Sequence, residues 1–312
     1  MKPKVAFYWC ASCGGCEEAV VDLDEDILKV VAAVDIVFWP VALDFKEKDV
    51  GAMPQGGIDI CFINGAVRTT EQQRMALLLR AKAKVVVAFG ACAQLGGIPA
   101  LANLTTAAEI LQEVNHTEQA EGLPRLFDSV FPLDRIIPVE YYIPGCPPTP
   151  RIILAAIEAL LAGQAPSLSD HALCDECPRK DTRPPDLLLP QLHRIPHYAL
   201  DPETCILAQG VPCLGPATRA GCEARCIGGN MPCTGCFGPT SRVRDFGAKA
   251  LSALASVVAA TEEKEIDTVF ENLPDPAGTF YRYSLPVGRG LPPAAARRGR
   301  PTTTGEPYGN HT

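Results

Sequence analysis

The sequence predicts an α/β fold in which a doubly wound parallel sheet is followed by an irregular, cysteine-rich region. Residues 4–163 alternate short apolar or β-branched runs with stretches of helical period, which is typical of βαβ units and a parallel sheet. Residues 164–240 are rich in Cys, Pro and Gly and show little periodicity. Such a region needs more than a hydrophobic core, and metal ligation can supply the missing folding energy.

The expected elements follow in order along the chain. Each strand is a short apolar run, and the apolar runs lie at residues 5–9, 36–43, 59–64, 84–92 and 139–146. Helical spacing marks residues 17–34, 68–83, 105–114 and 149–163, the last with Pro150 in its first turn and Gly163 as a C-cap. A further helix is expected at about residues 241–260.

Length and charge limit the possible functions. The 312 residues suggest about two domains. Lys and Arg number 28 against 36 Asp and Glu, and the net charge of −8 argues against binding to nucleic acid or an anionic membrane. No apolar run approaches the roughly 18 residues of a membrane span, and we find neither a signal peptide nor a twin-arginine pattern. We therefore expect a cytoplasmic protein.

The cysteines are unusual in number and position. The 14 cysteines are too few for a small disulfide scaffold. A reducing compartment would not keep them as disulfides, and so many thiols in such a compartment most often bind metal. Six lie in the first 150 residues and eight lie between Cys174 and Cys236. The chain is therefore expected to be a metalloprotein.

Four cysteines follow predicted strands, where the loops of an open parallel sheet converge on a ligand. Cys13 and Cys16 follow the first strand, Cys92 ends the fourth, and Cys146 ends the fifth. Four thiolates suit a tetrahedral zinc ion or an iron–sulfur cluster. The neighbouring glycines would let the backbone approach a bulky cluster; they are Gly14, Gly15, Gly90 and Gly145.

Two other cysteines in this half have different expected roles. Cys10 is the first thiol of C-x2-C-x2-C, so the ligand pair could be Cys10 and Cys13. We favour Cys13 and Cys16, because Cys10 still belongs to the strand end and is expected to face a covering helix. Cys61 lies in the middle of a strand and is expected to be a core residue.

The eight later cysteines divide into two sets of four, because the close pairs CDEC, GCEARC and PCTGC can form the corners of clusters. One set is Cys222, Cys226, Cys233 and Cys236, and the other is Cys174, Cys177, Cys205 and Cys213. A zinc ribbon is the alternative for these cysteines. We favour iron–sulfur, since zinc does not explain the site on the sheet and three clusters in line would conduct electrons.

These motifs resemble the small-subunit family of [NiFe] hydrogenases, which is related to the 20-kDa-type subunit of respiratory complex I. The matching motifs are Cys13-x2-Cys16, Gly-Ala-Cys92, Gly-Cys146-Pro-Pro, CDECPRK, GPATRAGCEARC and MPCTGCFGP. The second half resembles cytoplasmic group 3 enzymes of the methyl-viologen-reducing, F420-non-reducing, heterodisulfide-reductase-associated type. The resemblance covers about residues 4–260. A complex I subunit would show adjacent cysteines in the first motif and would lack the eight-cysteine half.

The resemblance implies three [4Fe–4S] clusters. Cys13, Cys16, Cys92 and Cys146 match the ligands of the proximal cluster, and Cys222, Cys226, Cys233 and Cys236 match those of the medial cluster. In many relatives a proline replaces one of these four cysteines and the medial cluster has three irons. The four cysteines here therefore imply a medial cluster with four irons. Many relatives ligate the distal cluster through His-x2-Cys, a spacing that His171 and Cys174 fit. We favour Cys174, Cys177, Cys205 and Cys213; the other histidines (116, 193, 197, 311) have no ligand partners nearby.

The resemblance also implies a division of labour among subunits. The nickel–iron site belongs to a large subunit, which splits H2, and the chain passes the electrons on. The acceptor would be an iron–sulfur or flavin subunit, either heterodisulfide-reductase-like or NAD(P)-linked. The chain has no G-x-G-x-x-G and no phosphate loop, which argues against a nucleotide of its own. The alternatives are a relay subunit of a related enzyme without nickel, and a zinc-stabilised scaffold protein.

Three regions are expected on these grounds. Residues 1–165 form a flavodoxin-like domain with the proximal cluster, and residues 166–260 form an iron–sulfur domain with two clusters. Residues 261–312 form a C-terminal extension that is partly disordered or wraps a partner, because its end is rich in Pro, Gly, Arg and Thr.

Overall fold

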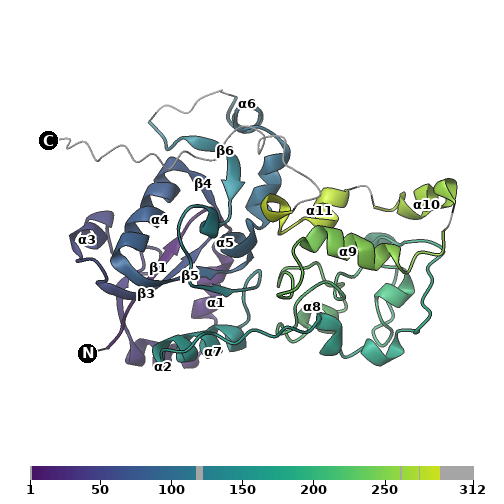
Figure 1. Cartoon of the computed structure of the whole chain (residues 1–312), viewed down its shortest axis with the longest axis horizontal. Coiled ribbons are helices and arrows are strands. Elements are labelled where there is room, and N and C mark those ends of the chain that lie inside the picture. The colour runs from purple at the N-terminus through teal and green to yellow at the C-terminus, as the bar shows by residue number, and fades with distance from the viewer. Residues whose placement is uncertain (1, 117–121, 261, 274, 289–312) are drawn as a thin grey trace.

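The computed structural model of the chain describes residues 2–116, 122–260, 262–273 and 275–288. Its main sheet has five parallel strands in the order β2-β1-β3-β5-β7, which is the strand order of flavodoxin-like sheets (Figure 1). The predicted α/β fold is therefore confirmed. The strands are β1 (Lys4–Trp9), β2 (Asp35–Phe38), β3 (Ile58–Asn64), β5 (Ala83–Phe89) and β7 (Tyr141–Ile143).

Helices cover both faces of this sheet, because alternate strand residues point to opposite sides. Phe7 and Phe62 lie in an apolar layer with α1, α2 and α7, and their ring centroids are 5.1 Å apart. Ala6 and Ile63 lie in a second layer with α3, α4 and α5. The helices of this half are α1 (Gly15–Val21), α2 (Asp26–Ala33), α3 (Glu47–Ala52), α4 (Thr70–Lys82), α5 (Ala91–Leu95), α6 (Ala107–Asn115) and α7 (Pro150–Leu161).

Several elements differ from the expected ranges for local reasons. The helix expected at 17–34 is divided, and Asp24 in the break has a left-handed φ of 52°. The strand expected at 36–43 ends at Phe38, before Pro40, which has no N–H for a sheet ladder. A small antiparallel sheet of β4 (Val67–Thr69) and β6 (Leu126–Phe131) is not among the predicted elements, because the three residues of β4 run directly into α4.

The cysteine-rich half carries little regular structure and lies beside the sheet domain, which it follows after α7 (Figure 1). Its helices before residue 261 are α8 (Arg225–Gly228) and α9 (Phe246–Ala255). The helix expected from residue 241 begins only at Phe246, because the Asp245 side chain accepts a 3.0 Å hydrogen bond from the Ala248 N–H and caps it. Two apolar clusters support this half, a larger one around α9 and a small one between the cysteine loops.

The segment after residue 261 packs against both halves as far as Gly288. It contains α10 (Glu263–Phe270) and α11 (Pro276–Phe280), and Phe280 and Leu285 are buried in the apolar cluster around α9. The Tyr283 carbonyl accepts a 3.0 Å hydrogen bond from the Gly97 N–H of the sheet domain. The remainder of the extension expected at 261–312, residues 289–312, lies outside the described residues. No helix among the described residues is long and apolar enough to cross a bilayer.

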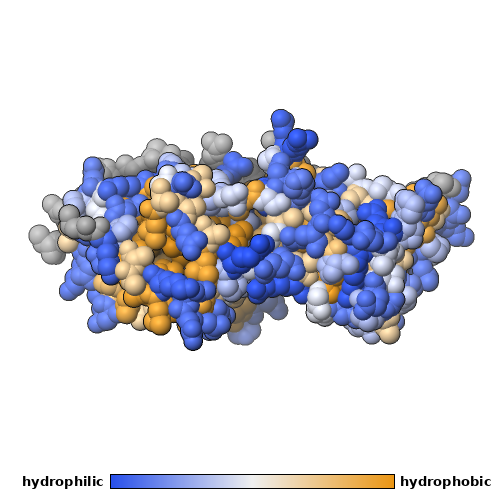
Figure 2. Space-filling model, turned by 90° about the horizontal axis from the view of Figure 1, so that it is seen from below, coloured by the Kyte–Doolittle hydropathy of each residue, from blue (hydrophilic) through white to orange (hydrophobic). Residues whose placement is uncertain are grey.

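The surface of the sheet domain carries apolar residues as well as charged ones. Figure 2 shows a group of hydrophobic side chains on one face of this half, next to strongly hydrophilic side chains. Exposed apolar residues of α2 include Leu28 and Val31. Apolar atoms contribute more than half of the accessible surface of ordinary folded proteins, so these residues by themselves indicate no particular partner.

Candidate metal centres

Four cysteines meet beyond the carboxyl ends of the main sheet. Cys13 and Cys16 lie where the chain passes from β1 into α1, Cys92 lies in the first turn of α5, and Cys146 follows β7. Burial raises the pKa of Cys16, and the thiolates of Cys92, Cys146 and Cys13 raise it further. The structure therefore brings these four thiols together, although they come from three separate loops.

The electrostatics of this group suit a cationic centre. Burial raises the pKa of Cys92 to about 12, with Cys146 and Cys13 contributing. Burial also raises the pKa of Cys146, again with a contribution from Cys13. Neighbouring thiolates in an apolar site repel one another, and the positive charge of bound iron relieves that repulsion.

Two glycines make room for the thiols, because they have no Cβ. Gly90 precedes α5 with a φ of +86°, and a Cβ there would overlap the Cys16 thiol. Gly97 has a φ of +60°, and a Cβ there would overlap the Cys92 thiol. Gly90 is among the glycines that the sequence marks, whereas Gly97 lies five residues beyond its cysteine and carries no such signal.

Cys10 and Cys61 lie on the opposite face of the sheet from Cys16. Both are buried in the apolar layer under α3, α4 and α5, and the Cys10 N–H donates to the Asn64 carbonyl at 2.8 Å. Burial raises the pKa of both thiols, that of Cys61 to about 12. This arrangement favours Cys13 and Cys16 as the pair that acts with Cys92 and Cys146.

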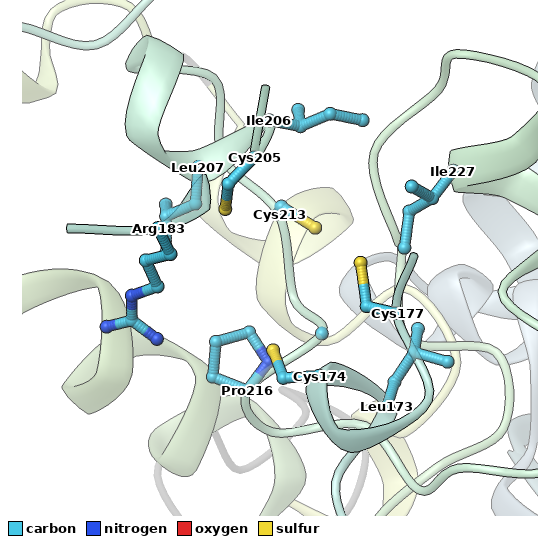
Figure 3. A pocket seen from close by; sticks show the side chains of 11 residues that line it. Leu173, Cys174, Cys177, Arg183, Cys205, Ile206, Leu207, Cys213, Pro216 and Ile227 are labelled. Carbon is cyan, nitrogen blue, oxygen red and sulfur yellow. The ribbon is translucent and has the colours of Figure 1, made fainter. Parts of the chain in front are cut away.

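A second group of four cysteines lines one pocket in the cysteine-rich half. Figure 3 shows the sulfur atoms of Cys174, Cys177, Cys205 and Cys213 around a common space. Burial raises the pKa of Cys174 to about 12, and the other three thiolates contribute. Arg183, which also lines the pocket, acts in the opposite direction. The remaining side chains of the lining are apolar and belong to Leu173, Ile206, Leu207, Pro216 and Ile227.

His171 does not line this pocket. Its side chain is 81% exposed, and its Nδ1 lies 3.7 Å from Oδ2 of Asp175. An imidazole that faces solvent and a carboxylate is poorly placed as an iron ligand, so the geometry favours Cys177 as the fourth donor. Among the other histidines, the His193 ring stacks on Tyr198 with centroids 4.4 Å apart. His311 lies outside the described residues.

The third group lies between the first two. Its members are Cys222, Cys226, Cys233 and Cys236. Burial raises the pKa of Cys236 to about 12, with contributions from Cys146, Cys226 and Cys222, while a hydrogen bond from the Cys146 backbone N–H lowers it. On the other side, the Cys233 N–H donates to the Cys213 sulfur at 3.4 Å. Direct backbone–sulfur contacts therefore connect this group to both neighbouring groups.

One supporting side chain is not among the candidate residues from the sequence. Arg179 is only 6% exposed and donates hydrogen bonds to segments that carry cysteines of two groups. Its signal in the sequence is its place in CDECPRK, directly after a cysteine pair and a proline. In the described part of the chain, no three or more His, Cys, Asp or Glu side chains are arranged to hold a single metal ion.

Comparisons with known proteins agree with the resemblance. The family model "NADH ubiquinone oxidoreductase, 20 Kd subunit" matches residues 13–160. The iron-sulfur subunit of the F420-non-reducing hydrogenase of Archaeoglobus profundus is 37% identical over 316 aligned residues, 92% of this chain and 97% of that protein. A vhu subunit of the F420-non-reducing hydrogenase of Methanocaldococcus jannaschii is 38% identical over 91% of this chain and 95% of that protein.

Solved structures match the fold across most of the chain. A chain of the [NiFeSe]-hydrogenase of Dm. baculatum superposes with a TM-score of 0.53 at 18% identity, covering 78% of this chain and 96% of that chain. A second structure of the Desulfomicrobium baculatum Ni-Fe-Se hydrogenase gives a TM-score of 0.51 at 19% identity. At these identities the likeness concerns the fold alone.

Proposed function

Because the chain belongs to the hydrogenase small-subunit family that includes these F420-non-reducing hydrogenase proteins, we propose that three [4Fe–4S] clusters in it carry electrons from H2 to a downstream acceptor. The catalytic nickel–iron site lies in the large subunit with which such small subunits pair. An iron–sulfur cluster, when bound, supplies reversible one-electron transfer. The residues of this chain hold the clusters, keep them apart from solvent and set their order.

The proposed ligands are the three groups of cysteines. The proximal cluster is assigned to Cys13, Cys16, Cys92 and Cys146; the medial cluster to Cys222, Cys226, Cys233 and Cys236; and the distal cluster to Cys174, Cys177, Cys205 and Cys213. The observation that carries the proposal is the middle position of the medial group. The backbone of Cys146 hydrogen-bonds to Cys236, and the backbone of Cys233 hydrogen-bonds to Cys213, so electrons have short steps from the first group to the last.

We further propose that the acceptor docks over the distal pocket. Its thiols lie at the end of the series, and exposed Arg183 lines the pocket beside them. The acceptor is an iron–sulfur or flavin subunit, either heterodisulfide-reductase-like or NAD(P)-linked. The proposed compartment is the cytoplasm, because all fourteen cysteines are free of disulfides and such thiols persist in a reducing compartment.

Metal analysis of the anaerobically purified complex tests this function. Three clusters of four irons predict twelve irons and twelve acid-labile sulfides per small subunit, a brown colour, and EPR signals from three centres on reduction. H2 should reduce all three. About three colourless zinc ions and no labile sulfide would overturn the proposal in favour of a scaffold protein. Twelve irons that H2 cannot reduce in the complex would overturn the assigned electron source.

A further inference from the structure

Arg179 is a buried cation held by backbone oxygens next to cluster ligands. Its Nη2 donates to the Ile227 carbonyl at 2.9 Å, and Ile227 directly follows Cys226 of the medial group. Its Nη1 donates to the Thr204 carbonyl at 3.5 Å, and Thr204 directly precedes Cys205 of the distal group. One guanidinium therefore fixes loops of both groups, while Arg179 itself follows Cys177 by two residues.

Arg179 forms no salt bridge among the described residues. Its other hydrogen bonds go to the Asn230 side-chain oxygen at 3.0 Å and to the Asp201 carbonyl at 3.4 Å. The exposed carboxylate of Asp201 accepts hydrogen bonds from the Thr204 hydroxyl and the Glu203 N–H. These hydrogen bonds lower the pKa of Asp201 most, and the Arg179 charge adds a smaller lowering, so this carboxylate is coupled to Arg179 only weakly. A buried charge is unfavourable unless opposite charge lies nearby, and neutral oxygens with one exposed, solvent-screened carboxylate compensate it only in part.

The apolar surroundings strengthen any charge effect at this position. Ile227, which accepts from Arg179, belongs to an apolar cluster that also contains Cys177 and Cys213 of the distal group and Cys222 and Cys233 of the medial group. Charges interact more strongly in such a medium than in water. An all-cysteine [4Fe–4S] cluster carries net negative charge, which becomes more negative when the cluster accepts an electron.

We propose that Arg179 is the counter-charge of the medial and distal clusters and sets their reduction potentials together. The inference rests on the proposed function. Because a nearby cation stabilises the reduced cluster, Arg179 raises the potentials of these two clusters relative to the proximal cluster. Electrons arriving from the sheet domain would then favour the medial and distal clusters. The four hydrogen bonds keep the two loops at a fixed distance from the charge.

The test is a redox titration of the intact complex followed by EPR, with Arg179→Gln, Arg179→Lys and the control Arg135→Gln. Arg179→Gln removes the charge and should shift the medial and distal midpoint potentials to more negative values, with the proximal potential unchanged. Arg179→Lys keeps the charge but loses the planar fork, so it should keep the potentials and lower the Tm. Arg135 is an exposed residue of the sheet domain, and its substitution should change neither.

A second variant keeps the inference testable if Arg179→Gln fails to assemble. Asn230→Asp keeps an acceptor for Nη1 and adds a negative charge beside the guanidinium. It should shift the same two potentials in the same direction as Arg179→Gln. Unchanged potentials in Asn230→Asp or Arg179→Gln, or an equal shift in Arg179→Lys, would refute the charge role. A wild-type complex without twelve irons would instead refute the proposed function on which the inference rests.

Discussion

The two halves of the molecule are stabilised in different ways. In the sheet domain, two apolar layers sandwich five strands. The four proximal cysteines lie at one edge of the sheet, and only Cys16 among them belongs to an apolar layer. In the cysteine-rich half, loops with little regular structure surround eight cysteines. The larger apolar cluster of this half packs around α9, and only a small one lies between the cysteine loops. With the proposed ligands, the comparison predicts that the same kind of site is an addition to one fold and a structural element of the other.

Removal of the clusters should produce the largest difference in stability between the two halves. After treatment of the complex with an oxidant and a chelator, backbone amides at residues 170–240 should lose hydrogen-exchange protection, because ligation replaces a core there. Amides of β1, β3 and β5 should stay protected. Equal loss of protection in both halves would show that the sheet also depends on its cluster.

Cys92→Ala should remove one cluster without unfolding the sheet. The variant should keep eight irons of twelve, and H2-dependent dye reduction should be lost because the first step of the relay is missing. Iron analysis and a dye assay measure both effects. Cys61→Ala is the matched control: it should keep twelve irons and full dye reduction, and lose about 1–2 kcal/mol of stability from a trimmed core. Twelve irons in Cys92→Ala would contradict its role as a ligand.

Gly90→Ala should disturb the same cluster through space rather than through a ligand. The new methyl group would overlap the Cys16 thiol, and the φ of +86° is unfavourable for alanine. We expect a weakened or altered proximal EPR signal with normal medial and distal signals. Gly51→Ala is the control, since a Cβ there meets no atom within 4 Å. A normal proximal signal in Gly90→Ala would argue that this cluster lies away from Gly90 and Cys16.

The smallest effects are expected at the two spare candidate ligands. His171→Ala and Cys10→Ser should each keep three four-iron clusters with unchanged EPR signals, because His171 faces solvent and Cys10 faces a helical layer. Cys177→Ser should alter or remove the distal signal. A shift of that signal in His171→Ala but not in Cys177→Ser would reverse the distal ligand assignment.

The sequence predicts the sheet domain well because its signals are local. Apolar runs that alternate with stretches of helical period predict the fold, and the position of Cys13, Cys16, Cys92 and Cys146 after the strands predicts their grouping. The breaks at Asp24 and Phe38 shorten two elements, but they do not alter the strand order. In contrast, Gly97 supports Cys92 by a close approach that only the folded loop creates.

In the cysteine-rich half, the sequence predicts the candidate ligands but not the side chains that hold their loops in place. The close pairs in the sequence indicate the cysteine groups, whereas the hydrogen bonds of Arg179 reach residues 22 to 51 positions away. The helices α10 and α11 are also missing from the expectations, because they are short, with 8 and 5 residues, and offer little periodicity. Their contribution to the core becomes visible only when Phe280 and Leu285 are seen beside α9.

The position of the Tyr283 segment has a consequence for biosynthesis. Its carbonyl accepts the N–H of Gly97, and Pro286 packs against Gly96, in the turn that directly follows α5, the helix that carries Cys92. A ribosome makes this segment almost two hundred residues after Cys92, so the turn has no such brace while most of the chain is being synthesised. If the proposed proximal cluster is assembled before synthesis reaches Tyr283, its assembly therefore takes place beside an unbraced turn.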